Sequence, residues 1–271
     1  MTTRMNEYVN RDRGMMFIPF ITAGDPDNEV TIELALMLQS IGANALELGI
    51  PYSDPLADGP VIQSASKRAL SHGETLSEAM SLVKTMRQKG LNIPVIIFTY
   101  ANVLSQFGLE AFFKKAEADE IDGLLIPDLP YEESRALAES CRKRDISLIS
   151  LVAPTTSERR LRLICRDAQG FIYCVSSLGV TGVRKTFHPD VFSFLKRVRQ
   201  VSDLPIAVGF GISSSEQVDQ LEDYADGFIV GSAIVSEIGQ RSNQLSDPLQ
   251  RPAAINEIRQ KLCQCLLAPI S

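Results

Sequence analysis

The sequence predicts an α/β protein that folds as a (β/α)8 barrel with extra terminal helices, in a single domain over residues 1–271. Short apolar runs rich in Val, Ile and Phe alternate along the chain with longer stretches of helical periodicity. This alternation is typical of parallel strands that helices cover on both faces. Eight such runs are present, the strand number of a closed barrel, and the length of 271 residues is close to the about 250 that are typical of this fold.

The eight strands are expected in the apolar runs themselves. In chain order these runs are residues 15–22, 45–50, 94–100, 123–128, 147–154, 170–176, 205–211 and 227–232. Between them, residues 28–43 and 132–145 have the apolar spacing of amphipathic helices. The polar residues 239–248 are expected to form a loop before a terminal helix at 253–267, and no Pro/Ser-rich linker divides the chain.

Composition excludes several classes of function. The chain has 27 basic and 33 acidic residues and no Lys/Arg block, which argues against a nucleic-acid or anionic-membrane partner. No apolar run is long enough to span a bilayer, and the amino terminus lacks the apolar core of a signal peptide. Five cysteines without a Cys-x-x-Cys pair, and only two histidines, indicate neither a disulfide framework nor a metal site. We expect a soluble cytoplasmic protein that binds no metal and handles a small metabolite.

Glu47 is the first candidate for chemistry, because it stands in the middle of the apolar run 45–50. The active site of a barrel lies at the carboxyl ends of its strands. A buried, unpaired carboxylate is costly unless it takes up a proton, and none of the eight runs contains a Lys or Arg partner. Desolvation moves the pKa of a carboxyl group toward the range useful for proton transfer, so Glu47 is expected to act as an acid or base.

Two aspartates follow in the loop after this strand. Asp54 precedes Pro55 and Asp58 precedes Gly59, so both could be ordinary turn residues. For Asp58, the position alone leaves a turn role and a functional role equally open.

Glycine-containing turns at the ends of the last strands are the second clue. They are "GFGIS" (209–213) and "VGSAI" (230–234), joined by "GVTG" (179–182) after the sixth strand. Backbone N–H groups near helix amino termini bind phosphate well, so a phosphorylated substrate is expected.

Several reactions could combine a carboxylate with a phosphate ester. A Schiff-base aldolase would need a lysine inside the barrel, and Lys185 in the loop after the sixth strand is the nearest candidate. Glu47, Asp54 and Asp58 could hold magnesium, but no histidine joins them. The residues therefore favour acid–base catalysis by carboxylates without a cofactor. Another phosphosugar-handling barrel, such as an isomerase, is an alternative that leaves the paired carboxylates unexplained.

The segment "LELGIPYSDPLADGPVIQ" (46–63) closely resembles the signature of the tryptophan synthase alpha chain family. Further segments resemble the landmarks of this family in the right order: "FIPFITAGDP" (17–26), "YANVLSQFG" (100–108), "PDLPYEES" (127–134), "GVTG" (179–182), "GFGISSSEQV" (209–218) and "GSAIV" (231–235). The resemblance covers nearly the whole chain and implies a TIM barrel.

The resemblance implies cleavage of indole-3-glycerol phosphate to indole and glyceraldehyde 3-phosphate, a retro-aldol reaction without a cofactor in this chain. Glu47 would protonate indole C3 and then take the proton of the side-chain hydroxyl. Asp58 would stabilise the positive indole N–H of the intermediate. This division of roles predicts a raised pKa for Glu47 and an ordinary pKa for Asp58.

The other site residues are assigned by position. Substrate contacts are expected from Phe20, Ile62, Phe98, Tyr100, Tyr173, Thr181 and Phe210. Among these, Ile62 and the three phenylalanines would form an apolar slot for indole. Thr181 would close onto the catalytic aspartate as part of a lid. The phosphate cradle is expected from Gly182, Gly211, Gly231 and Ser232.

The family also implies a partner, a beta chain that carries pyridoxal phosphate and receives the indole in an alpha2beta2 heterotetramer. Pro51, Asp54, Asn102 and Pro130 are expected to face this partner. One alternative from a different class of function is an alpha chain of weak or no activity that serves mainly as an allosteric activator of the beta chain.

Overall fold

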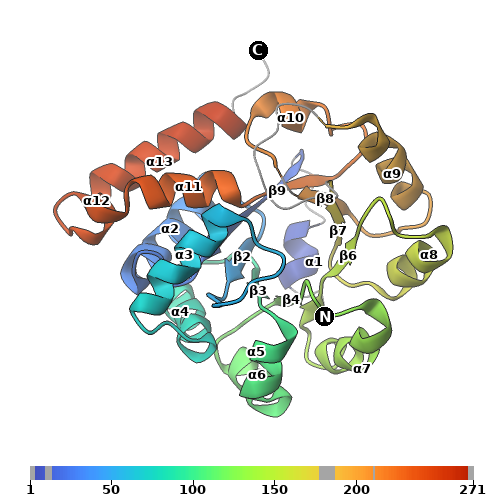
Figure 1. Cartoon of the computed structure of the whole chain (residues 1–271), viewed down its shortest axis with the longest axis horizontal. Helices are drawn as coiled ribbons and strands as arrows, with labels where there is room; N and C mark the ends of the chain where they lie inside the picture. Colours follow the sequence, from blue (N-terminus) through green and yellow to red (C-terminus); the bar gives the residue numbers. More distant parts are fainter. Residues whose placement is uncertain (1–3, 10–13, 177–186, 210, 268–271) are drawn as a thin grey trace.

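The predicted barrel is confirmed. The computed structural model describes residues 4–9, 14–176, 187–209 and 211–267. All of its paired strands are parallel and belong to one sheet, in the order β5-β4-β3-β2-β1-β9-β8-β7-β6, with helices arranged around it (Figure 1). The strands are β1 (Met16–Thr22), β2 (Leu46–Gly49), β3 (Val95–Phe98), β4 (Gly123–Leu125), β5 (Ser147–Leu148), β6 (Ser150–Val152), β7 (Ile172–Val175), β8 (Ile206–Gly209) and β9 (Gly227–Val230).

The barrel closes through the fifth predicted strand, which is divided into β5 and β6. Only Ile149 separates these two strands, and its side chain is buried in the barrel interior. β5 pairs with β4, whereas β6 pairs with β7. One chain segment therefore joins the two ends of the sheet order, and the nine short strands correspond to the eight predicted runs.

The helices surround the sheet with the expected alternation. They are α1 (Arg4–Val9), α2 (Asn28–Ser40), α3 (Pro60–Ser71), α4 (Leu76–Gln88), α5 (Ala101–Phe107), α6 (Leu109–Ala118), α7 (Tyr131–Arg142), α8 (Glu158–Asp167), α9 (Pro189–Arg199), α10 (Ser215–Asp219), α11 (Ser232–Gln240), α12 (Ser242–Ser246) and α13 (Arg251–Leu266). Helix α2 begins at a side-chain cap, where Asp27 Oδ1 accepts a 2.8 Å hydrogen bond from the Val30 N–H. Within the described residues, no helix is both long and apolar enough to cross a membrane.

The prediction of a loop at 239–248 is partly wrong. Helix α11 continues to Gln240, and α12 occupies the middle of the stretch. The reason is Leu245, which is completely buried in the core although its neighbours are polar. Its carbonyl oxygen also accepts a 2.8 Å hydrogen bond from Arg251 Nε at the start of α13, which ties the short helix to the terminal one.

Alternation along each strand decides which residues enter the barrel. In β2, Leu46 and Leu48 pack in the layer between strands and helices, so Glu47 between them faces the interior. The interior is filled by a separate apolar cluster, to which α1 contributes Met5 and Val9. Met5 lies against Gly123 and Gly170, both at the amino-terminal ends of strands, so α1 covers that end of the barrel (Figure 1).

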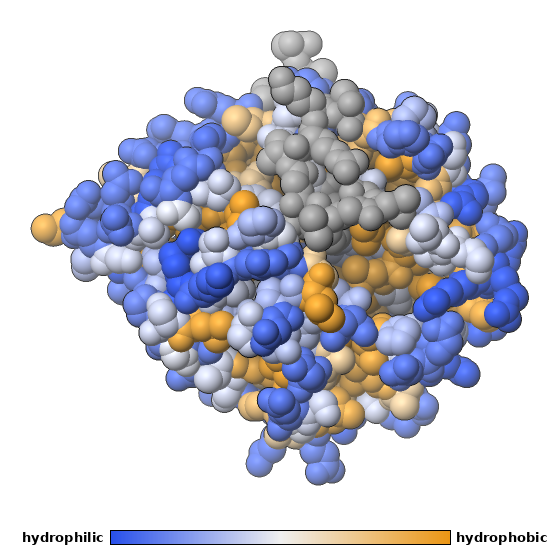
Figure 2. All heavy atoms as spheres, in the orientation of Figure 1, coloured by the Kyte–Doolittle hydropathy of each residue, from blue (hydrophilic) through white to orange (hydrophobic). Residues whose placement is uncertain are grey.

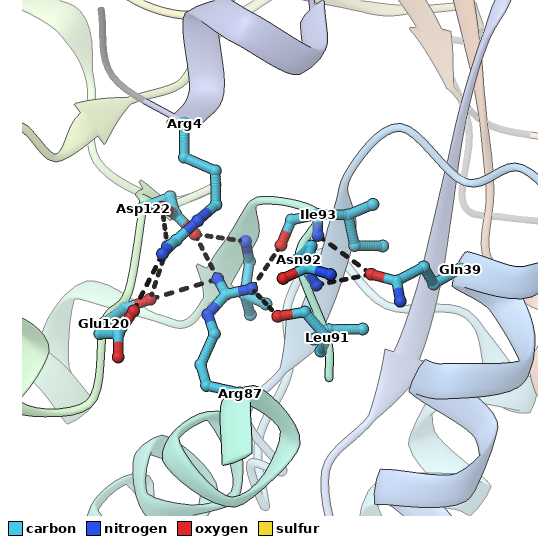
Figure 3. Close-up of polar contacts among 9 residues, drawn as sticks. Arg4, Gln39, Arg87, Leu91, Asn92, Ile93, Glu120 and Asp122 are labelled. Carbon is cyan, nitrogen blue, oxygen red and sulfur yellow. Dashed lines mark hydrogen bonds and ion pairs between the residues drawn. The ribbon is translucent and has the colours of Figure 1, made fainter. Parts of the chain in front are cut away.

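A polar network fixes this closed end (Figure 3). The Asp122 carboxylate accepts hydrogen bonds from Arg4 Nη1 at 2.7 Å, from Arg87 Nη2 at 2.6 Å and from the Val95 N–H at 2.8 Å. Arg87 also donates to the carbonyl oxygens of Leu91 and Ile93. The network joins α1, α4, β3 and β4 at the face opposite the strand carboxyl ends. Residues at this face of a barrel are expected to stabilise the fold and not to take part in catalysis.

Candidate active site

Glu47 lies in the barrel interior with no polar compensation. Its side chain is 1% exposed, and neither carboxyl oxygen has a hydrogen-bond partner among the described residues. The strand register places it between Phe20 of β1 and Ile96 of β3. Burial raises the pKa of the Glu47 carboxyl to about 8, because the charged form loses its hydration. At neutral pH the group is mostly protonated and can deliver a proton.

Asp58 lies in the β2–α3 loop, and its carboxylate is bonded by Tyr100, the N-cap residue of α5. Asp58 Oδ2 accepts a 3.0 Å hydrogen bond from Tyr100 Oη, and Tyr100 Oη accepts a 3.1 Å hydrogen bond from the Ala57 N–H. Helix α3 has Gly59 as its N-cap, with no side-chain capping bond. The Asp58 side chain is therefore directed to a tyrosine of another element and does not serve only its own turn.

The expectation of an ordinary pKa for Asp58 is wrong. Partial burial of the group raises the pKa of the Asp58 carboxyl. The hydrogen bond from Tyr100 opposes this rise because it favours the ionised carboxylate. Burial thus raises the pKa of both carboxyl groups, and of the two only Asp58 accepts, within the described part of the chain, a hydrogen bond that opposes this rise.

Three of the residues expected in the apolar slot come together. Phe20, Ile62 and Phe98 form one cluster with Ala65 and Val235, which the sequence did not identify. The rings of Phe20 and Phe98 meet edge to face, with centroids 5.5 Å apart. Phe210, the fourth expected member, lies outside the described residues.

Two glycines make room for the aromatic rings in the barrel mouth. A Cβ atom at Gly49 would lie 2.3 Å from Phe20 Cζ, and a Cβ at Gly209 would lie 2.2 Å from Tyr173 Oη. Tyr173 is buried, and the charges of Glu47 and Asp58 add to desolvation in raising the pKa of its hydroxyl. Tyr173 therefore lies within electrostatic reach of both carboxyl groups.

Part of the expected phosphate cradle is placed at a helix amino terminus. Gly231 is the N-cap of α11 and Ser232 is its first residue, so the free N–H groups of the first turn lie where phosphate is expected. Gly211 follows β8 with φ +84°, a conformation that favours glycine. Thr181 and Gly182 lie outside the described residues.

The residues expected to face a partner differ in exposure. Asp54, Asn102 and Pro130 are exposed, whereas Pro51 is buried. A cavity of about 670 Å³ opens beside Pro130, between the β4–α7 and β6–α8 loops. Figure 2 shows apolar side chains gathered on this side of the molecule.

Sequence reasoning missed Tyr52. Its ring packs on the ring of Tyr100, with centroids 5.0 Å apart, and its hydroxyl accepts a 2.6 Å hydrogen bond from Asn102 Nδ2. The signal in the sequence was an aromatic residue two positions after the apolar run that carries Glu47, in a loop with no other aromatic residue.

Metal ligands are not grouped in the part of the chain that the structure describes. No three or more His, Cys, Asp or Glu side chains there lie close enough to share an ion. The exposed Asp54 carboxylate accepts a 2.5 Å hydrogen bond from the neighbouring Ser53 hydroxyl, whereas the Asp58 carboxylate accepts its hydrogen bond from Tyr100.

Comparisons with known proteins identify the family of the chain. The sequence profile of the family described as tryptophan synthase alpha chain matches residues 7–263. The tryptophan synthase alpha chain of Shouchella clausii is 60% identical over 260 residues, which are 96% of each protein. A chain of the tryptophan synthase a2b2 complex of Pyrococcus furiosus has a TM-score of 0.83 at 36% identity, covering 93% of this chain and 98% of that one. The Legionella pneumophila alpha chain has a TM-score of 0.83 at 35% identity, covering 97% and 98%. The chain therefore belongs to the tryptophan synthase alpha chain family.

Proposed function

We propose that this chain cleaves indole-3-glycerol phosphate to indole and glyceraldehyde 3-phosphate by acid–base retro-aldol chemistry. One observation carries the proposal: a fully buried carboxyl group, Glu47, without a hydrogen-bond partner among the described residues and with its pKa raised to about 8. Such a group is costly to the fold, and its pKa suits proton transfer near neutral pH. The aromatic slot next to it, with Phe20 and Phe98, matches the flat apolar shape of indole.

The reaction needs one proton delivered and one removed. Protonated Glu47 gives its proton to indole C3, which leaves the ring nitrogen positive. The Glu47 carboxylate then takes the proton of the side-chain hydroxyl while the C–C bond breaks, and its electron pair returns to the ring. Indole and the aldehyde leave, and Glu47 is protonated again, so no net proton is consumed.

Asp58 stabilises the intermediate. Its carboxylate accepts a hydrogen bond from the positive indole N–H, and the Tyr100 hydrogen bond orients that carboxylate and favours its ionised form against the effect of burial. Gly231 and Ser232 hold the phosphate through backbone N–H groups at the start of α11, together with Gly182 and Gly211. Tyr173 and Ile62 complete the substrate contacts, and Thr181 closes the lid.

We also propose that the chain works in the cytoplasm as part of an alpha2beta2 complex, whose beta chain carries the pyridoxal phosphate and receives the indole. Three observations support the docking face. Asp54, Asn102 and Pro130 are exposed, Leu56 in the same loop as Asp54 is 85% exposed, and the cavity beside Pro130 is partly apolar. An exposed large apolar side chain and a partly apolar hollow are both suited to contact with another protein. Pro51, being buried, would support the loop from beneath.

The alternative of an alpha chain that only activates its partner is not favoured. Both carboxyl groups lie at the barrel mouth, and Glu47 has no structural partner among the described residues that would explain its burial. A chain without lyase activity would have no use for the desolvated acid.

The test is the release of indole from indole-3-glycerol phosphate, with and without a beta chain. We expect turnover in the wild-type protein and a loss of at least about 100-fold in Glu47→Gln, since a positioned acid or base contributes about 10²–10⁴-fold. Glu74→Gln is the matched control, because Glu74 is also a buried glutamate but lies against Gly24, outside the barrel. Normal turnover in Glu47→Gln would remove this residue from the reaction.

A further inference from the structure

A buried glutamine holds the loop that follows β8. Gln217 belongs to the short helix α10 and is 1% exposed. Its Oε1 atom accepts hydrogen bonds from the Ser213 N–H at 2.8 Å and from the Ser213 hydroxyl at 3.3 Å. Its Nε2 atom donates to the Gly211 carbonyl oxygen at 3.2 Å. One side chain thus bonds both ends of the segment 211–213.

The backbone fixes the orientation of this amide. The Ser213 N–H can only donate and the Gly211 carbonyl can only accept, so the oxygen of Gln217 faces Ser213 and its nitrogen faces Gly211. An ionised glutamate could not donate to Gly211, and a methionine of similar length could make neither bond. The two bonds together therefore select an amide at position 217.

Gly211 needs such a restraint. Its φ is +84°, and a residue without a Cβ atom has many accessible orientations of its peptide groups. The bond from Gln217 fixes the Gly211 carbonyl oxygen, and the planar trans peptide then directs the Ile212 N–H to the opposite side, away from Gln217. That N–H has no acceptor within the described part of the chain. The glutamine thus turns a donor of the loop outward.

The segment 211–213 lies beside the amino terminus of α11. Ser213 and Ser232 line the same cavity, of about 260 Å³. β8 also pairs with β9, which leads directly into Gly231 and the first turn of α11. The proposed phosphate cradle therefore consists of two neighbouring backbone segments, and Gln217 braces the first of them.

We infer that Gln217 is a positioning residue for the phosphate group of the substrate. It holds Gly211 and Ser213 so that backbone N–H groups of their loop are aligned on the phosphate oxygens. This inference rests on the proposed function and extends the phosphate site to a side chain that does not itself touch the substrate. Because phosphate takes no part in the bond cleavage, Gln217 acts on substrate binding and not on the chemical step.

Gln39 offers a matched control. Its Oε1 atom accepts hydrogen bonds from the N–H groups of Asn92 at 2.6 Å and Ile93 at 3.2 Å (Figure 3). Its Nε2 atom donates to the Gly90 carbonyl oxygen at 3.0 Å. The half-buried Gln39 thus braces a loop in the same manner, but before β3, at the end of the barrel opposite the strand carboxyl ends.

The experiment compares four full-length chains: wild type, Gln217→Met, Gln217→Asn and the control Gln39→Met. For each, kcat and KM for indole release from indole-3-glycerol phosphate are measured with saturating beta chain. The Kd of inorganic phosphate and the Kd of indole, which carries no phosphate, are measured by calorimetry on the chain alone. Thermal unfolding shows whether each variant is folded at the assay temperature.

We expect Gln217→Met to raise both KM and the Kd of inorganic phosphate about tenfold, because an N–H aligned on a charged oxygen forms a strong hydrogen bond that misalignment weakens. The kcat value and the Kd of indole should stay within about twofold of the wild type, since the lost interaction is made equally in the ground and transition states. Gln217→Asn should change KM in the same direction, because its shorter side chain cannot reach both backbone groups. Gln39→Met should match the wild type in KM and in both Kd values.

A folded Gln217→Met variant with the KM and phosphate Kd of the wild type would overturn the role of Gln217. An equal loss of phosphate affinity in Gln39→Met would also overturn it, because the loss would then reflect the stability of the fold. If Gln217→Met does not fold, an unchanged KM in Gln217→Asn would refute the inference. No indole release by the wild type, together with a raised phosphate Kd in Gln217→Met, would overturn the proposed function and still support Gln217 as the residue that positions a phosphate site.

Discussion

Replacing Glu47 by Gln should change how the stability of this protein depends on pH. A glutamate ionises near pH 4.5 in the unfolded chain, whereas burial raises the pKa of folded Glu47 to about 8. Between these values the unfolded state releases a proton that the folded state keeps, so the free energy of unfolding falls as pH rises. The stability contribution is complete below about pH 4.5 and is lost by about pH 8.

The size of the effect follows from the same two values. A difference of about 3.5 pKa units, at 1.36 kcal/mol per unit, corresponds to about 5 kcal/mol of stability lost across this window. Gln cannot ionise, so Glu47→Gln removes this dependence and leaves that of every other group in place. Compared with the wild type, the variant should therefore gain about 5 kcal/mol in relative stability between pH 4.5 and pH 8.

The assay is urea unfolding of both proteins at pH 4.5, 6, 7 and 8.5, with the difference in unfolding free energy plotted against pH. Because Gln is buried in the same site, its fixed desolvation cost shifts the whole difference curve but not its slope. A difference that does not change with pH would show that folded Glu47 ionises like an exposed glutamate. The account of its burial would then be refuted.

Two further substitutions test the barrel mouth and the closed end. Gly49→Ala should strongly impair indole release, because its Cβ would lie 2.3 Å from Phe20 Cζ and would displace a ring of the indole slot. Thermal unfolding should show a stability loss of about 1–3 kcal/mol from overpacking, and the loss in kcat/KM from steady-state kinetics, expressed as an activation free energy, should be larger. Asp122→Asn should destabilise the fold by about 3 kcal/mol in urea unfolding, because the nearly buried Arg87 loses its charged partner and Arg4 keeps only Glu120, while KM stays at the wild-type value. Lost activity with unchanged stability in Asp122→Asn, or lost stability with unchanged activity in Gly49→Ala, would contradict the placement of these residues.

The strands were predictable because parallel barrel strands, covered on both faces, are mostly apolar. Every one of the eight apolar runs contains a strand. The division of the fifth run into two strands at Ile149 was not predictable, because Ile149 is as apolar as a strand residue. The helix around Leu245 was missed because one buried leucine among polar residues has no periodicity. The family resemblance is confirmed by the match over residues 7–263.

The site was predictable where a single residue contradicted its surroundings. The burial of Glu47 without a basic partner agrees with the structure, and its catalytic role is a proposal. The pKa of Asp58 was predicted wrongly because a sequence does not show how far tertiary packing buries the side chain of a loop residue. The bond from Asn102 to Tyr52 joins residues 50 positions apart and depends on tertiary packing, so no local pattern indicates it.

The most direct test of the central claim is the pH dependence of kcat/KM for indole release from indole-3-glycerol phosphate. If Glu47 must be protonated in the free enzyme, kcat/KM should fall about tenfold per pH unit above about pH 8, with substrate and fold unaffected over that range. A profile that stays flat to pH 9.5 would contradict the role of Glu47 as the acid that begins the reaction.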